Sequence, residues 1–210
     1  MSIVYPLSLP TSIGIAQIEL RSNNLVALSE SPFTFKQQVF KHPGERWEAT
    51  VSLPRQRKEY IEPWIAFMLS LKGQSGTFLL GDPNGKAPQG VISNASVTVL
   101  TDGAAATGDS QISVKNLPLD TPSLLVAGDY IQLGHGNTAT LHKVLMSVDS
   151  DAEGKSQIEF WPALRRNVQD EEVVVTDNAV GKFRLSNNGN RWSINDRSAY
   201  QFSFEAMEAL

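Results

Sequence analysis

Three consecutive segments decide the fold of this chain: RWEATVSL at Arg46–Leu53, PRQRKEYIEPWIAFMLSLKG at Pro54–Gly73, and GTFLLGDP at Gly76–Pro83. Apolar and polar residues alternate in the first segment, which is the period-2 pattern of a strand with one buried face. The second segment changes to helical spacing, and its final glycine is a typical helix stop. The third is a short apolar run that leads into a Gly-Pro turn. Together they predict strand, helix and strand, with the helix at about residues 57–72.

The predicted helix is apolar around more than half of its circumference. Its apolar side chains form two adjacent rows: Tyr60, Trp64, Phe67 and Leu71, and Ile61, Ile65 and Met68. The two rows cover roughly 200°, whereas packing on one sheet face needs a stripe of about 100°. We therefore expect cover on two sides, from a sheet and from a second surface. The helix begins either near Pro54 or at Glu62, with Pro63 tolerated in the first turn.

Composition excludes several classes of protein. The chain has no cysteine, which excludes a disulfide scaffold and leaves only histidine and carboxylates for a metal. No apolar run approaches about 18 residues, and the N-terminus lacks a basic segment followed by an apolar core. We therefore expect neither contact with a membrane nor secretion. The net charge is −4 without a Lys/Arg block, so we expect no nucleic-acid recognition.

Aromatic residues divide the chain into a flank, an insert and a second flank. Only three of the 17 aromatic residues lie in 84–172, so the large packing groups belong to the flanks. A terminal strand from Tyr200 must bury its aromatic face, and the N-terminal flank is its nearest aromatic partner. We predict a mainly β protein. A β-sandwich-like domain with one helix comprises 1–82 and 174–210, and a β-barrel comprises 83–173.

Local signals refine each part. In residues 1–40, short β-like runs alternate with turn signals at Arg21–Asn24 and Ser29–Pro32, and His42–Gly44 is expected to turn the chain into the strand at Arg46. The insert contains five short β-branched segments and no convincing helix; they begin at Val91, Gln111, Asp129, Thr140 and Gln157. Five such strands predict a small barrel of the OB type.

Two glycine-containing loops resemble ligand motifs only in part. Gly81–Lys86 has three residues between its glycines, whereas a phosphate loop needs four and a Ser or Thr after the lysine. Asp149–Gly154 matches the first half of a calcium loop, but Phe160 stands where a bidentate Glu is required. We interpret both loops as turns.

Other polar groups also fall short of a site. His135 and His142 are two candidate ligands where zinc needs three or four. Asp170–Glu172 contains neighbouring carboxylates, as a glycosidase would require, but an acidic run before a strand more often protects a sheet edge. We therefore expect no catalytic residue, no metal and no cofactor.

Trp161 supports an alternative function. It is followed by Arg165 and Arg166, and an aromatic ring beside cations suits carbohydrate. On this hypothesis, the chain is a carbohydrate-binding module that recognises the host surface through its barrel. The other interpretation is a tryptophan that closes the barrel. A third hypothesis, a hydrolase that uses Asp149, Asp151 or Glu171, ranks last because these carboxylates lie in predicted turns.

Five segments, in this order, resemble the distal tail proteins of siphophages. They are PWIAFMLSLKGQSGTFLLGDPNG at 63–85, AGDYIQLG at 127–134, LHKVL at 141–145, IEFWPALR at 158–165 and GKFRL at 181–185. The resemblance extends from the predicted helix almost to the C-terminus, while residues 1–45 carry little of it. None of the segments is catalytic, so the resemblance is to an architecture.

This resemblance implies a β-rich first domain with one helix, closed by the C-terminal strand, and a second, OB-like domain. In that family the first domains form a hexameric ring at the tip of a long, non-contractile tail. The ring joins the tail tube protein to hub and fibre or adhesin proteins. The resemblance therefore implies a structural virion protein that is assembled in the host bacterial cytoplasm. Neighbouring copies in a ring would supply the second cover that the predicted helix needs.

Overall fold

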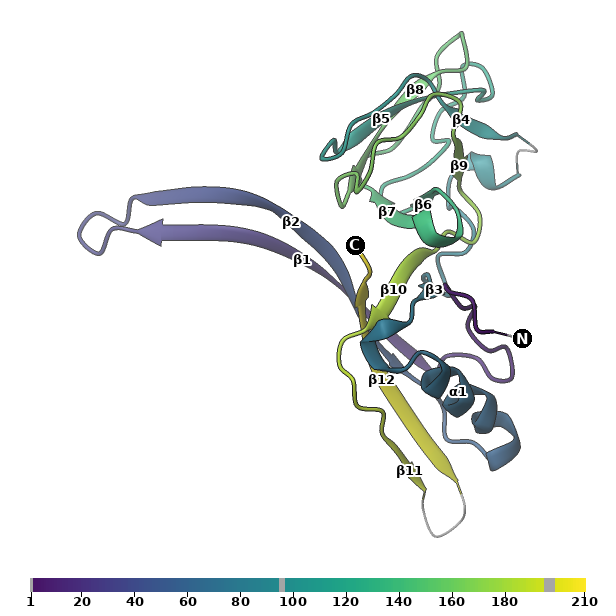
Figure 1. Ribbon diagram of the computed structural model, residues 1–210. Helices are drawn as coiled ribbons and strands as arrows, with labels where there is room; N and C mark the ends of the chain where they lie inside the picture. Colours follow the sequence, from purple (N-terminus) through teal and green to yellow (C-terminus); the bar gives the residue numbers. More distant parts are fainter. Residues whose placement is uncertain (1, 95–96, 195–198) are drawn as a thin grey trace.

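The computed structural model describes residues 2–94, 97–194 and 199–210. The protein is mainly β, with one α-helix and a closed antiparallel barrel, which confirms the fold class expected from the sequence. Figure 1 shows the barrel at one end of the molecule, a sheet with the helix at the other, and a long hairpin that projects sideways from the sheet.

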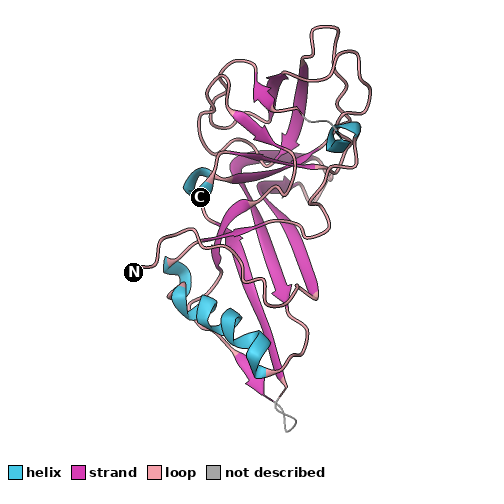
Figure 2. Cartoon of the chain, turned by 90° about the vertical axis from the view of Figure 1, so that its right-hand side faces the viewer, coloured by secondary structure: helices cyan, strands magenta, loops and turns pink. Residues whose placement is uncertain are grey.

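A six-stranded sheet forms the body of the protein, in the order β1-β2-β12-β10-β3, with β11 also paired to β12. Its strands are β1 (Gln17–Glu30), β2 (Gln37–Ser52), β3 (Phe78–Leu80), β10 (Gly181–Leu185), β11 (Trp192–Ile194) and β12 (Tyr200–Glu208). As its alternating pattern predicted, β12 buries Phe202, Phe204 and Ala206. The described strands outside the barrel form one sheet rather than a sandwich, because the helix covers the face that a second sheet would cover (Figure 2).

The barrel has the closed order β4-β5-β8-β7-β6-β9. Its strands are β4 (Val99–Thr101), β5 (Gln111–Lys115), β6 (Tyr130–Leu133), β7 (Thr140–Val144), β8 (Ser156–Trp161) and β9 (Val173–Val175). The six described strands exceed the five of an OB-fold, because β9 pairs with both β4 and β6 and closes the ring of strands. The barrel therefore runs past the boundary expected at residue 173.

Three short 3₁₀ helices connect these elements: η1 (Gly73–Ser75), η2 (Val91–Asn94) and η3 (Gly136–Thr138). The strand expected from Val91 begins only at Val99, as β4, because Val91 begins η2. The N–H groups of Val91 and Ile92 donate to the carbonyls of Ser123 and Leu124, so the segment is held by a loop rather than by a strand.

β1 and β2 form one continuous hairpin, although turns were predicted at Arg21–Asn24 and His42–Gly44. Asn24 pairs with Glu45, and the register shifts before Val26, which pairs with Lys41. His42–Gly44 therefore forms a bulge opposite Leu25, the one residue between Asn24 and Val26. Such a bulge accommodates Pro43, which has no N–H to donate to the ladder. The prediction failed because a proline that breaks a regular strand is tolerated in a bulge.

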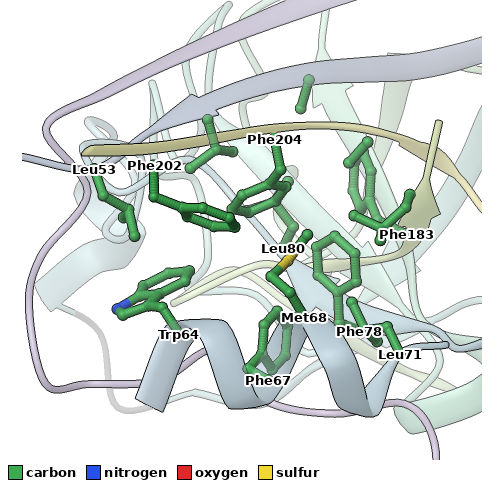
Figure 3. Packing of buried hydrophobic residues seen from close by; sticks show 14 of the residues in the cluster. Leu53, Trp64, Phe67, Met68, Leu71, Phe78, Leu80, Phe183, Phe202 and Phe204 are labelled. Atoms are coloured by element: carbon green, nitrogen blue, oxygen red, sulfur yellow. The ribbon is translucent and has the colours of Figure 1, made fainter. Parts of the chain in front are cut away.

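The helix α1 (Lys58–Ser70) begins between the two predicted starts, with Pro63 in its second turn. Its buried side chains are Ile61, Trp64, Ile65, Phe67 and Met68. They pack on the aromatic face of the sheet (Figure 3); Phe67 and Phe78 meet edge to face at 5.6 Å between ring centroids. The prediction that Tyr60 is buried is wrong. It is 45% exposed, because it lies in the first turn, at the end of the packed stripe.

The N-terminal segment of the same chain supplies the second cover for α1. The Tyr5 hydroxyl donates to the Ser70 carbonyl at 2.6 Å, and the Ser12 hydroxyl donates to the Tyr60 carbonyl at 2.9 Å. Partly buried apolar residues of this segment pack on the same core: Tyr5, Leu7, Leu9, Ile13 and Ile15. The helix is covered on two sides, as expected. Because this cover comes from its own chain, α1 gives no support to a ring.

Replacing Tyr5 with phenylalanine is expected to lower the free energy of unfolding by about 1 kcal/mol, since the ring still packs but the hydrogen bond to Ser70 is lost. Chemical denaturation measures this change, and Ser12→Ala tests the hydrogen bond at the other end of α1 on the same scale. Unchanged midpoints in both variants would show that the segment does not stay on the helix in solution.

Candidate functional site: the apolar arm and the domain junction

The outer part of the β1–β2 hairpin, residues 24–42, is termed the arm and points away from the body (Figure 1). At its tip, Phe33 is 92% and Phe35 is 73% exposed. Along the strands five more large apolar side chains are exposed: Leu25, Val26, Leu28, Val39 and Phe40. Exposed large apolar side chains gathered in this way are typical of interaction sites.

The two faces of the arm differ. Leu28 lies opposite Val39 and Val26 lies two residues along, so these three aliphatic side chains share one face. Phe40 lies opposite Ala27 on the other face. The arm therefore presents an aliphatic face, a face with one aromatic ring, and a tip with two. A partner can cover one face and the tip together.

A buried ionic cluster joins the barrel to the sheet. Arg165, which follows β8, pairs with Glu208 of β12 at 3.3 Å, and their side chains are 15% and 4% exposed. Arg165 also donates to the backbone carbonyl of Glu45 in β2. The Glu45 carboxylate accepts the Ala163 N–H at 2.9 Å and pairs with Lys41 at 3.0 Å. One guanidinium thus connects β2, β12 and the barrel.

The two carboxylates of the cluster respond differently to burial. Burial raises the pKa of Glu208, and the nearby Arg165 offsets this only in part. Burial also acts to raise the pKa of Glu45, but the Ala163 N–H and the Lys41 ammonium outweigh it, so that this pKa lies below its ordinary value. Glu208 is therefore the group of the cluster that depends most on the arginine.

Trp161 packs at the same junction. Its ring meets Trp47 of β2 edge to face at 4.6 Å between centroids, and its Nε1–H donates to Asn24 Oδ1 at 2.8 Å. Together with Tyr130 and Lys143, the two tryptophans line a cavity of about 360 Å³ beside the base of the arm. The ring proposed as a carbohydrate platform thus contacts the sheet domain.

The two candidate histidines have different surroundings. His135 is exposed before η3, whereas His142 is fully buried in β7. His142 Nδ1–H donates to the Pro162 carbonyl at 2.7 Å, since a carbonyl only accepts, and Nε2 accepts from the Thr140 hydroxyl at 2.9 Å. Burial lowers the pKa of His142 to about 4. Both ring nitrogens are engaged within the chain, so His142 is placed as a structural residue.

The carboxylates of the hydrolase hypothesis cap backbone groups in loops. Asp149 Oδ1 accepts the Ser123 N–H at 2.6 Å. Asp151 Oδ1 accepts the N–H groups of Glu153 and Lys155 at 3.1 and 2.7 Å. These bonds shape the loop between β7 and β8, where the sequence predicted a turn.

The acidic run before β9 is paired with cations of the barrel surface. Asp170 and Glu171 lie 3.1 and 3.5 Å from Lys115, and Glu172 pairs with Arg166. The pKa of Asp170 lies below its ordinary value, chiefly because its carboxylate accepts the Gly103 N–H. The hydrogen bond from Lys115 is the second cause. The run therefore consists of compensated charges beside a strand.

Gly81–Lys86 is a turn organised by Asp82, whose carboxylate accepts the Asn84 N–H at 2.9 Å and whose carbonyl accepts the Gly85 N–H at 3.2 Å. Among the residues that the structure describes, no group of three or more His, Cys, Asp or Glu side chains could hold a metal ion. No helix in this described part is long and apolar enough to cross a membrane.

Sequence reasoning missed the arm. A signal was present, because Phe33-Thr34-Phe35 directly follows the Ser29–Pro32 turn and thus places two rings where a hairpin reverses, away from any core. It also missed the ionic cluster, whose members are scattered along the sequence. No protein-family model matches this chain, and no curated protein matches it in a sequence search.

Proposed function

We propose that this chain is a distal tail protein, a structural virion protein that forms a ring at the tip of a long, non-contractile phage tail. The ring contains six copies in the resembled family. It joins the tail tube protein to hub and fibre or adhesin proteins, and it is assembled in the cytoplasm of the host bacterium. The proposal rests on the five resembling segments and on the arm. It does not rest on α1, because this helix is covered by its own chain.

The exposed arm is the observation that carries the proposal. A buried aromatic side chain removes about 150–250 Å² from water, so the three phenylalanines of the arm would remove roughly 450 Å² at their observed exposures. This is more than half of the about 800 Å² that each partner buries in an interface of standard size. The aliphatic face adds to that area. The arm is therefore suited to bind another protein.

The placement of the arm favours a closed assembly. In Figure 1 the arm leaves one side of the sheet, whereas α1 and the N-terminal segment lie on the other side. An arm that binds the far side of the next copy makes a head-to-tail contact, and such contacts close into rings when the rotation permits. A structural subunit of this kind works through binding area and needs no reactive group.

The decisive experiment is imaging and mass measurement of the purified full chain. We expect negative-stain electron microscopy to show rings with a central hole at micromolar concentration, and light scattering to give the mass of a closed oligomer. Tails that lack this protein should retain it in a pull-down. A chain that stays monomeric and is not retained by tails would contradict the proposal.

A paired substitution on the arm tests which surface assembles. Leu28→Lys with Val39→Glu places an opposite-charge pair on the aliphatic face and should raise the concentration needed for assembly about tenfold or more. The matched control is Ser29→Lys with Gln38→Glu, the adjacent cross-strand pair on the other face. The control should assemble normally. Equal loss in both variants would assign the effect to the hairpin itself rather than to its aliphatic face.

A further inference from the structure

A cavity of about 630 Å³ is lined by Trp64 of α1 and by the N-terminal segment. Figure 1 shows both elements on the side of the body away from the arm. The walls of the cavity are the N-terminal segment 8–15, the turn 81–86 and residues 178–180, and Trp64 and Leu79 also line it. The lining is mostly apolar and includes Leu9, Ile13 and Ile15, which are only partly buried. Its volume falls in the range of about 300–1,000 Å³ that is typical of binding pockets.

We propose that this cavity receives the arm tip of a second copy of the chain, with Phe33 and Phe35 inserted against its apolar lining. The inference deepens the proposed ring and rests on it. It names the two surfaces that meet: the tip on one side of each copy and the cavity on the other. Because the surfaces differ, the contact is head-to-tail and repeats around a ring.

Charge supports this occupant. The two exposed rings of the tip are flanked by Glu30 and Lys36, one acid and one base. The rim of the cavity carries one acid and one base as well, Asp82 and Lys86. A tip that enters with Lys36 toward Asp82 and Glu30 toward Lys86 pairs both charges. The reverse orientation sets like charges against each other, so the rim selects one direction of entry.

Cysteine cross-linking tests the contact without background, since the chain has no cysteine of its own. Thr34→Cys places a thiol at the tip, and Thr11→Cys places one on the exposed wall of the cavity. We expect mild oxidation of the double variant to give a ladder of linked copies up to the closed ring. An equal mixture of the two single variants should give linked dimers. Thr34→Cys with Ser110→Cys, on the barrel surface, is the matched control and should give few.

The outcomes separate this inference from the proposed function. Rings without a link between positions 34 and 11 would overturn the docking and leave the ring standing. Neither rings nor retention on tails would overturn both. Equal linking to position 110 would also overturn the docking. So would mass spectrometry of assembled tails in which position 11 is linked to another tail protein instead of to position 34.

Discussion

Replacing Arg165 with alanine is expected to lower the free energy of unfolding by about 3–5 kcal/mol at pH 7. The substitution leaves Glu208 as a buried carboxylate without its cation, and it removes the guanidinium that also binds the carbonyl of Glu45. Urea denaturation measures the change. The control is Lys155→Ala, which removes a half-exposed pair with Asp102 and should cost less than about 1 kcal/mol.

The loss in Arg165→Ala should shrink as the pH falls. Burial already raises the pKa of Glu208, and removal of the arginine raises it further. A carboxyl with a raised pKa in the folded state takes up a proton there before it does so in the unfolded chain, so folding gains stability as the pH falls through that pKa. Glu208→Gln in the Arg165→Ala background should recover part of the loss at pH 7. A loss that is independent of pH would show that the buried charge is not its cause.

His142 is expected to make the protein less stable by about 3 kcal/mol between pH 7 and pH 4. Its pKa falls from an ordinary 6.5 to about 4 in the folded protein, chiefly because the ring is buried. Below about pH 6.5 the unfolded chain therefore binds a proton that the folded chain rejects. The stability due to neutral His142 is complete above pH 6.5 and is lost progressively toward pH 4.

The measurement is the free energy of unfolding at several pH values between 7 and 4. His142→Gln should be less stable at pH 7, because it disturbs a buried site, and its stability should depend less on pH across this window. His135→Gln changes an exposed histidine and should keep the slope of the parent protein. If His142→Gln and the parent lose stability in parallel, the carboxylates rather than His142 govern the acid response.

The junction and the arm serve different purposes in the proposed ring. The cluster around Arg165 fixes the barrel on the sheet, and the edge-to-face pair of Trp47 and Trp161 adds apolar contact there. The arm lies outside both cores, so its phenylalanines and aliphatic residues contribute little to folding of the free chain. Substitutions at the junction are therefore expected to affect stability, and substitutions on the arm to affect assembly.

Local pattern was sufficient wherever an element packs by its own periodicity. The alternation at Arg46–Leu53 predicted the inner half of β2, helical spacing predicted α1, and the alternating aromatic residues from Tyr200 predicted β12. Turn chemistry was less reliable. His42–Gly44 carries a strong turn signal, yet it lies in a bulge of a continuous strand, because the pairing on either side of it outweighs the local preference.

The sequence by itself determined that the chain is mainly β and that it has one helix with too much apolar surface for a single sheet. These conclusions depend on spacing within one segment. Only the tertiary structure decided what covers the helix, that the first strands form an arm, and that Arg165 joins Glu45 and Glu208. Arg165 and Glu45 are 120 residues apart, and periodicity carries no information about contacts at that separation. Such contacts follow from how the elements pack together, and so the surface left over for a partner was visible only once the chain had folded.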